Sequence, residues 1–258
     1  MTEPLASLLA VAQNSLLTAF LVFLRIGAVM AVLPAFGERS VPERVRLVLA
    51  IGFTAIVFPA VSEGLAPLAA SQEKVAAALL TEVISGLILG LSLRLFVMVL
   101  QIAGALIAQS TSLSQIFGGG AVEAQPAIAH LLSVAGLALA VMMGLHVRVA
   151  ELLILSYDVF PAGFMAPARD VMIWSVDHVG RIFALSFTLA APFIIASLVY
   201  NVALGVINRA MPQLMVAFVG APAITLGGLL LLFVSAPLLL ETWEAGFARL
   251  LLDPFGAR

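Results

Sequence analysis

Apolar runs long enough to cross a membrane recur along this sequence. Residues 210–240 carry no charged side chain, and a helix needs only about 20 residues to cross the hydrocarbon core. Of the whole chain, 63% is hydrophobic and 10% is charged, against about 45–50% and about 25% in soluble globular domains. The sequence therefore predicts an integral membrane protein and excludes a water-soluble enzyme.

Six such runs can be distinguished, and breaks containing proline and glycine separate them. They cover residues 5–33, 47–62, 75–115, 124–157, 171–207 and 210–240. The longest exceed one simple crossing, so they must extend past the membrane or bend. Pro192, Pro222 and Pro237 lie inside apolar runs, where proline kinks a helix. We predict an all-α, polytopic membrane protein with about six long, partly kinked helices. It would form a single membrane domain over residues 1–258, without a separate soluble domain.

Two further patterns predict how these helices pack. Small residues recur four positions apart, a spacing that lets helices approach closely. They are Gly86 with Gly90, and Gly136 with Ala140 and Gly144. The C-terminal residues 241–253 mix aromatic with charged side chains. This mixture suits an amphipathic end at the membrane interface or against a partner.

No motif for catalysis, cofactor binding or metal binding is present. The sequence has no cysteine, and His130, His146 and His178 are not spaced as metal ligands. Neither a phosphate-binding G-x-x-x-x-G-K-[ST] loop nor a serine nucleophile elbow with a plausible base occurs. The net charge of −2 leaves no basic excess for nucleic acid. We predict a non-enzymatic protein that needs no cofactor or metal.

The ionisable residues inside the apolar runs include Arg25, Glu82, Arg94 and Arg181. Such groups are costly in lipid, so they usually face protein, water or each other. One interpretation is an ion or proton relay, and the other is snorkelling or a structural ion pair. Since no fixed spacing pairs these charges, the structural interpretation is favoured.

Residues 109–125 form a polar exception between two very apolar runs. Irregular backbone at membrane depth is tolerated only inside protein or beside water. The segment is either a pore-lining or plugging loop or a solvent-exposed connector. Its candidate pore residues combine hydroxyls, two bulky apolar side chains and a glycine hinge. They are Ser110, Thr111, Ser112, Leu113, Ser114, Gln115, Ile116, Phe117, Gly118, Gly119 and Gly120.

Two longer blocks are more specific. Residues 25–50 contain the pattern R-x-G-A…P-x-F-G…V-P…R, and residues 204–228 contain N-R-x-x-P-Q…G-x-P. Together with the length and the six-run layout, they resemble the FliR family of the type III secretion export gate, flagellar or virulence-associated. The matching positions are Arg25, Gly27, Pro34, Phe36, Gly37, Val41, Pro42, Arg44, Arg46, Asn208, Arg209, Pro212, Gln213, Gly220 and Pro222.

This resemblance implies a subunit of an export gate in the bacterial inner membrane, at the flagellar basal body. Family members are non-enzymatic and are arranged as helical hairpins within a hetero-oligomer. Their partners are two smaller membrane proteins in multiple copies, a further subunit that wraps the entrance, and unfolded exported proteins. The resemblance also implies a role in templating gate assembly and a pore plug at about residues 110–120. Here Gly118–Gly120 replace the Asp-Pro that many members carry near the tip of that loop.

Two functions remain as alternatives. A virulence secretion gate would share the same blocks, although they look more like the flagellar branch. A small-molecule or ion secondary transporter would show inverted repeats with matching broken helices, and no convincing repeat is present.

Overall fold

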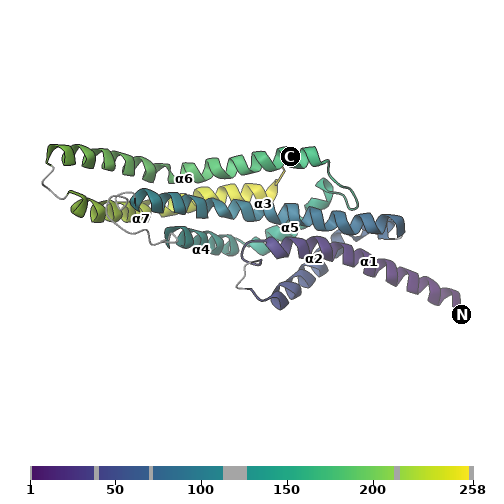
Figure 1. Cartoon of the computed structure of the whole chain (residues 1–258). Coiled ribbons are helices and arrows are strands. Elements are labelled where there is room, and N and C mark those ends of the chain that lie inside the picture. Colours follow the sequence, from purple (N-terminus) through teal and green to yellow (C-terminus); the bar gives the residue numbers. More distant parts are fainter. Residues whose placement is uncertain (1, 38–40, 70–71, 113–126, 212–215, 256–258) are drawn as a thin grey trace. The chain divides into compact units, whose positions relative to one another are not determined.

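The computed structural model describes residues 2–37, 41–69, 72–112, 127–211 and 216–255, and every regular element within these ranges is a helix (Figure 1). The helices are α1 (Thr2–Val32), α2 (Glu43–Ala69), α3 (Gln72–Ser112), α4 (Ala127–Met142), α5 (Leu145–Val159), α6 (Ala168–Ala210) and α7 (Val216–Leu252). The predicted all-α class is confirmed.

By length and composition, five described helices can each cross a membrane: α1, α2, α3, α6 and α7. The pair α4 and α5 passes the same test together but bends by 74° at its break. With this pair taken as one span, the described residues hold up to six spans. The six predicted hydrophobic segments are therefore confirmed.

One predicted segment is built differently from what its sequence indicated. Residues 124–157 read as a continuous run, but the chain turns at Gly144, whose φ of 80° is left-handed. Glycine adopts this conformation without the steric cost that a Cβ imposes. Gly144 therefore lies between α4 and α5, where a Cβ would meet no atom within 4 Å. The prediction that Gly144 continues the close helix packing of Gly136 and Ala140 is wrong.

Internal prolines do not end the described helices. α2 runs to Ala69 through Pro59 and Pro67, past the predicted boundary at residue 62. α6 contains Pro192, and α7 contains Pro222 and Pro237. In apolar surroundings, neighbouring helices and local backbone adjustments let a membrane helix continue through proline.

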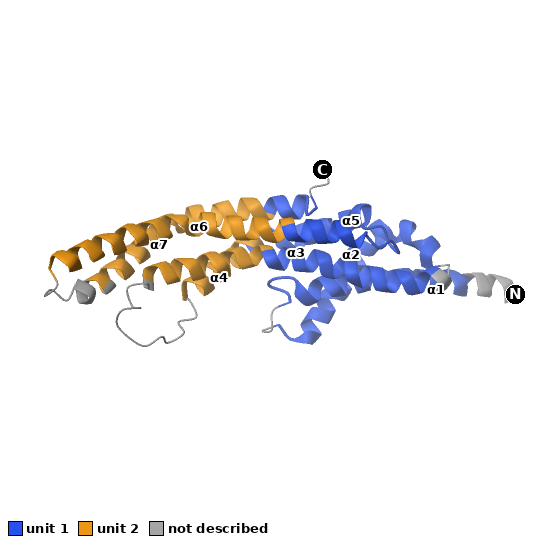
Figure 2. Ribbon diagram, turned by 45° about the horizontal axis from the view of Figure 1, so that its top comes forward, with its two compact units in different colours: residues 1–95, 141–176, 248–258 blue, residues 96–140, 177–247 orange. Residues whose placement is uncertain are grey.

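The described chain divides into two compact units (Figure 2). Unit 1 comprises residues 1–95, 141–176 and 248–258, and unit 2 comprises residues 96–140 and 177–247. In unit 1, Gly86 and Gly90 of α3 pack against α1. A Cβ at Gly86 would overlap the Arg25 carbonyl oxygen, and one at Gly90 would overlap the Val32 side chain. The predicted close packing at these two glycines is confirmed.

Unit 2 has an aromatic core around Trp243 of α7. This side chain is fully buried, its ring stacks on Phe247 at 5.1 Å, and its Nε1–H donates to the Phe96 carbonyl at 3.2 Å. A Cβ on Gly136 of α4 would collide with Leu100 of α3. α7 continues as a helix to Leu252. Its two aromatic residues in 241–253, Trp243 and Phe247, are buried and therefore pack inside their own chain.

Candidate functional site

Unit 1 holds a fully buried ion pair between α1 and α3. Arg25 Nε donates to Glu82 Oε2 at 2.7 Å, and Arg25 Nη2 donates to Glu82 Oε1 at 2.9 Å. Both side chains are 0% exposed. A parallel, two-point pairing of guanidinium and carboxylate is the strongest common form of this interaction. The two charges therefore neutralise each other inside the protein.

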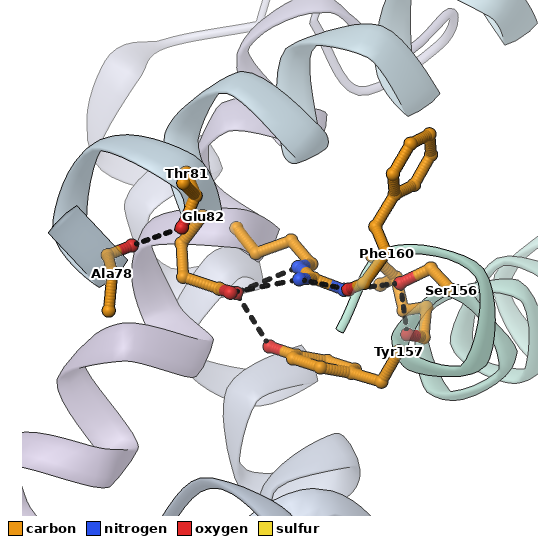
Figure 3. Close-up of polar contacts among 8 residues, drawn as sticks. Ala78, Thr81, Glu82, Ser156, Tyr157 and Phe160 are labelled. Atoms are coloured by element: carbon orange, nitrogen blue, oxygen red, sulfur yellow. Dashed lines mark hydrogen bonds and ion pairs between the residues drawn. The ribbon is translucent and has the colours of Figure 1, made fainter. Parts of the chain in front are cut away.

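The last turn of α5 completes the site (Figure 3). Arg25 Nη1 donates to Ser156 Oγ at 3.0 Å, and Nη2 donates to the Phe160 carbonyl at 2.8 Å. The Tyr157 hydroxyl donates to Glu82 Oε2 at 3.1 Å, and the Arg25 Cζ lies 3.6 Å from the Tyr157 ring centroid. A cation is favoured at a helix C-terminus, where carbonyl groups point outward.

This network joins three helices through polar groups that satisfy one another. The Ser156 hydroxyl accepts from Arg25 and donates to the Leu153 carbonyl at 2.7 Å. Because both side chains of the pair are fully buried, neither faces water. The arrangement therefore favours a structural ion pair over an ion or proton relay. Sequence reasoning named Arg25 and Glu82 but missed Ser156, Tyr157 and Phe160. The signal for Arg25 and Glu82 was that residues of opposite charge stand within two apolar runs. No spacing in the sequence pointed to the other three residues, because they lie more than 130 positions from Arg25.

The other two charged residues that the sequence analysis singled out lie elsewhere. Arg94 of α3 is exposed. Arg181 of α6 is 59% exposed and pairs with Asp177 at 3.0 Å, one turn earlier on the same helix. Among the described residues, no group of three or more His, Cys, Asp or Glu side chains could hold a metal ion.

The first motif block builds the connection from α1 to α2. Gly37 donates its N–H to the Leu33 carbonyl at 2.6 Å, and Ala35 takes a left-handed φ of 67°. A Cβ at Gly37 would lie 2.8 Å from two carbonyl oxygens. The Phe36 ring meets Phe53 of α2 edge-on at 6.4 Å. Pro34, Phe36 and Gly37 thus belong to a tight turn. Only glycine fits at position 37, because a Cβ there would collide with the backbone.

The rest of that block starts α2. The Pro42 carbonyl accepts from the N–H groups of Val45 and Arg46, and the Val41 carbonyl accepts from Arg46 Nη2 at 3.4 Å. Arg44 is exposed. Gly27 lies in α1, and a Cβ there would meet no atom within 4 Å.

The second block is only partly described. Asn208 and Arg209 are exposed at the end of α6, whereas Pro212 and Gln213 lie outside the described residues. The Gly220 carbonyl of α7 accepts from the Tyr200 hydroxyl of α6 at 2.9 Å. Pro222 follows in α7 and is exposed.

The candidate pore segment begins inside a helix. Ser110, Thr111 and Ser112 form the last turn of α3. The hydroxyls of Ser110 and Thr111 donate to carbonyls three residues earlier, and Ser197 of α6 donates to the Ser110 carbonyl at 2.6 Å. Leu113, Ser114, Gln115, Ile116, Phe117, Gly118, Gly119 and Gly120 lie outside the described residues. Their predicted role as a plug stays a prediction.

Comparison with known proteins decides the family. The model for bacterial export proteins, family 1, matches residues 16–250. The chain belongs to the FliR family. Among relatives named flagellar biosynthetic protein FliR, the one from Caulobacter vibrioides is 34% identical over 251 residues, which span 94% of this chain and all of the relative. The Aquifex aeolicus relative is 29% identical, covering 91% of both chains. The Escherichia coli relative is 27% identical, covering 88% of this chain and 87% of its own.

Membership of the FliR family identifies the chain as a membrane component of the flagellar type III export apparatus, located in the inner membrane. It also confirms a transport component rather than an enzyme. The buried network and the tight α1–α2 turn thus belong to the scaffold of an export protein and not to a catalytic centre.

Proposed function

We propose that this FliR-family chain helps to form the export channel together with two smaller membrane proteins in multiple copies, and that it templates their assembly. A further subunit would wrap the entrance, and unfolded flagellar proteins would pass through the channel. The observation that carries the proposal is the large apolar surface of α6 and α7. Such a surface is stable only against lipid or against other membrane helices.

That surface lies on the parts of α6 and α7 that belong to unit 2. On α6, Val199 is 64% exposed and Val206 is 66% exposed. On α7, Phe233 is 81% exposed and Val234 is 75% exposed. Gly227 adds an open position, because a Cβ there would meet no atom within 4 Å. Large apolar side chains beside a small residue provide the ridge and groove that a neighbouring helix needs.

The polar end of α6 adds a second contact. Asn208 and Arg209 are exposed after a long apolar stretch, and they belong to the N-R-x-x-P-Q block. An amide and a guanidinium can satisfy backbone groups that a broken helix leaves free. In the assembled gate we place these two side chains, with Pro212 and Gln213, against a partner subunit.

The segment from Ser110 to Gly120 would close the resting channel. Ile116 and Phe117 would form an apolar constriction that excludes water, and Gly118–Gly120 would act as its hinge. Deleting 114–120 should leave the complex assembled but make the membrane leak small solutes, as an uptake assay would measure. If this deletion assembles normally and leaks no more than wild type, the segment is a connector.

The main experiment is purification of the tagged chain from membranes that contain the native flagellar proteins. We expect a stoichiometric complex with two small membrane proteins, and a stable, monodisperse monomer would contradict the proposal. Arg209→Ala should lower the yield of this complex. Arg169→Ala is the matched control, because Arg169 is exposed at the other end of α6. Equal yields from the two variants would show that the N-R-x-x-P-Q block does not contact a partner subunit.

A further inference from the structure

The turn that follows α7 packs against the end of α5 and the start of α6. α7 ends at Leu252, and Pro254 cannot continue the helix because it has no N–H. The Pro254 carbonyl accepts from Trp174 Nε1 at 3.1 Å. The Phe255 ring meets Phe160 edge-on at 4.8 Å and lies 4.9 Å from the Trp174 ring. Three separate stretches of unit 1 therefore meet in one aromatic cluster.

Phe160 belongs both to this cluster and to the buried network. Its ring contacts Phe255, and its carbonyl accepts from Arg25 Nη2 at 2.8 Å. Its N–H donates to the Ser156 carbonyl at 2.8 Å, but its ψ of 80° is not helical. Pro161 follows, and a residue before proline avoids the helical conformation. Since the helix does not fix the direction of the Phe160 carbonyl, the packing of the Phe160 ring must help to hold it.

The turn is brought to this place by the end of α7. Leu250 and Leu251 are buried in unit 1, with exposed fractions of 9% and 4%. Phe160 is also buried, whereas Phe255 is half-buried. Phe255 therefore lies between the surface and a residue that serves the buried pair, so that the ring closes the cluster from outside.

We propose that Pro254 and Phe255 form a latch that positions the Phe160 carbonyl for Arg25. With the latch closed, Arg25 keeps its acceptors on both α3 and α5. With the latch released, the end of α5 shifts, and the guanidinium loses an acceptor in an apolar interior, where a missing hydrogen bond is costly. Because such coupling is reciprocal, the buried pair and the docked turn stabilise each other. The end of α7 is thus tied to the network that joins α1, α3 and α5.

A thiol at position 156 tests the latch, because the chain has no cysteine of its own. Ser156 is 3% exposed, beside Arg25 and one turn before Phe160. Membranes that contain the tagged Ser156→Cys chain are treated with N-ethylmaleimide, and mass spectrometry of the recovered chain measures the modification. The thiolate is the reacting form, and apolar surroundings suppress it. We expect slow modification in Ser156→Cys and a loss of this protection when Phe255→Ala is added.

Phe36→Ala is the matched control for this measurement. Phe36 is also a half-buried phenylalanine of unit 1 that lies outside a helix, and it meets Phe53 edge-on at 6.4 Å. Added to Ser156→Cys, it should leave the thiol protected. Equal modification with and without Phe255→Ala would overturn the proposal. An equal rise in Phe36→Ala would also overturn it, because unit 1 would then be loosened in general.

A double-mutant cycle gives a second measurement, with Arg25→Lys as the changed background. Lysine keeps a cation beside Glu82, but its single ammonium cannot reproduce the fork that reaches both Glu82 and the Phe160 carbonyl. Phe255→Ala should lower the thermal unfolding midpoint of the purified complex, and lower it less in the Arg25→Lys background. Equal drops in the two backgrounds would show that Phe255 packs against its neighbours without positioning the carbonyl, and the proposal would fail.

Discussion

Arg25 and Arg94 each interrupt an apolar stretch of a membrane helix, yet the two guanidinium groups have opposite surroundings. Arg25 is fully buried, and its hydrogen bonds reach α3 and α5. Arg94 is exposed on α3, twelve residues beyond the Glu82 that pairs with Arg25. The same residue type therefore serves two purposes. One arginine ties helices of its own chain together, and the other is left for surroundings outside the chain.

The largest expected effect comes from breaking the buried pair on one side only. Glu82→Leu or Arg25→Met would leave an unpaired charge in an apolar interior, at a cost of about 3–5 kcal/mol. We expect the single variants to be degraded or to yield no complex, as immunoblots of membranes would show. Replacing both residues together should restore much of the protein, because no uncompensated charge remains.

The control for this comparison is the exposed pair on α6. Arg181→Ala removes one partner of an ion pair whose side chains are 59% and 66% exposed. Exposed pairs contribute about 0–1 kcal/mol, so the amount of protein should stay close to wild type. Losses as large as those of Glu82→Leu would show that burial does not decide the importance of these charges.

A smaller effect is expected from the packing that brings the buried pair together. Gly86→Val would place side-chain atoms against the Arg25 carbonyl and Ala28 Cβ, and overpacking of this kind costs about 1–3 kcal/mol. A lower thermal unfolding midpoint of the purified complex would report it. Gly180→Ala is the control, because a Cβ at Gly180 of α6 meets nothing within 4 Å. A midpoint for Gly86→Val equal to that of Gly180→Ala would contradict the close contact.

Tyr157→Phe should have a more limited effect on the same network. It removes the hydroxyl that donates to Glu82 Oε2 but keeps the ring beside Arg25. One hydrogen bond to a charged group is worth about 1.5 kcal/mol or somewhat more. The unfolding midpoint should fall, while both arginine contacts to α5 remain. In the background of the double replacement of Arg25 and Glu82, the same change should have almost no effect, since the carboxylate acceptor is gone.

The smallest effect on stability is expected at Arg94. Substitutions at exposed positions without packing contacts usually change stability by less than about 0.5 kcal/mol. The unfolding midpoint and the yield of the complex should therefore be unchanged in Arg94→Ala. A collapse of the protein comparable to that of Arg25→Met would mean that Arg94 supports the fold, and the contrast between the two arginines would disappear.

Much of the architecture could be predicted from the sequence. Apolar runs placed the helices, since a chain this hydrophobic must satisfy its backbone internally in lipid. The Gly86 and Gly90 spacing predicted close packing, and Pro34 to Gly37 predicted the break after α1. The end of α2 was predicted too early, at residue 62. The helix continues through Pro59 and Pro67 to Ala69, because a proline that interrupts a helix in water is tolerated in an apolar environment. A bend in one of the longest runs was expected, but its position at Gly144 was not, because a lone glycine in an apolar run gives no sign of its φ.

The membrane class, the helical content and the family follow from the sequence, because hydropathy and the two motif blocks are local properties of the chain. Which charges meet depends on how the helices pack. Arg25 and Glu82 are separated by 57 positions, and Arg25 and Phe160 by 135, so no short-range spacing relates them. Their contact depends on α1 approaching α3 at Gly86 and on α5 ending beside both helices. The same packing leaves Arg94 outside, because the helical period of α3 turns that position away from its buried face.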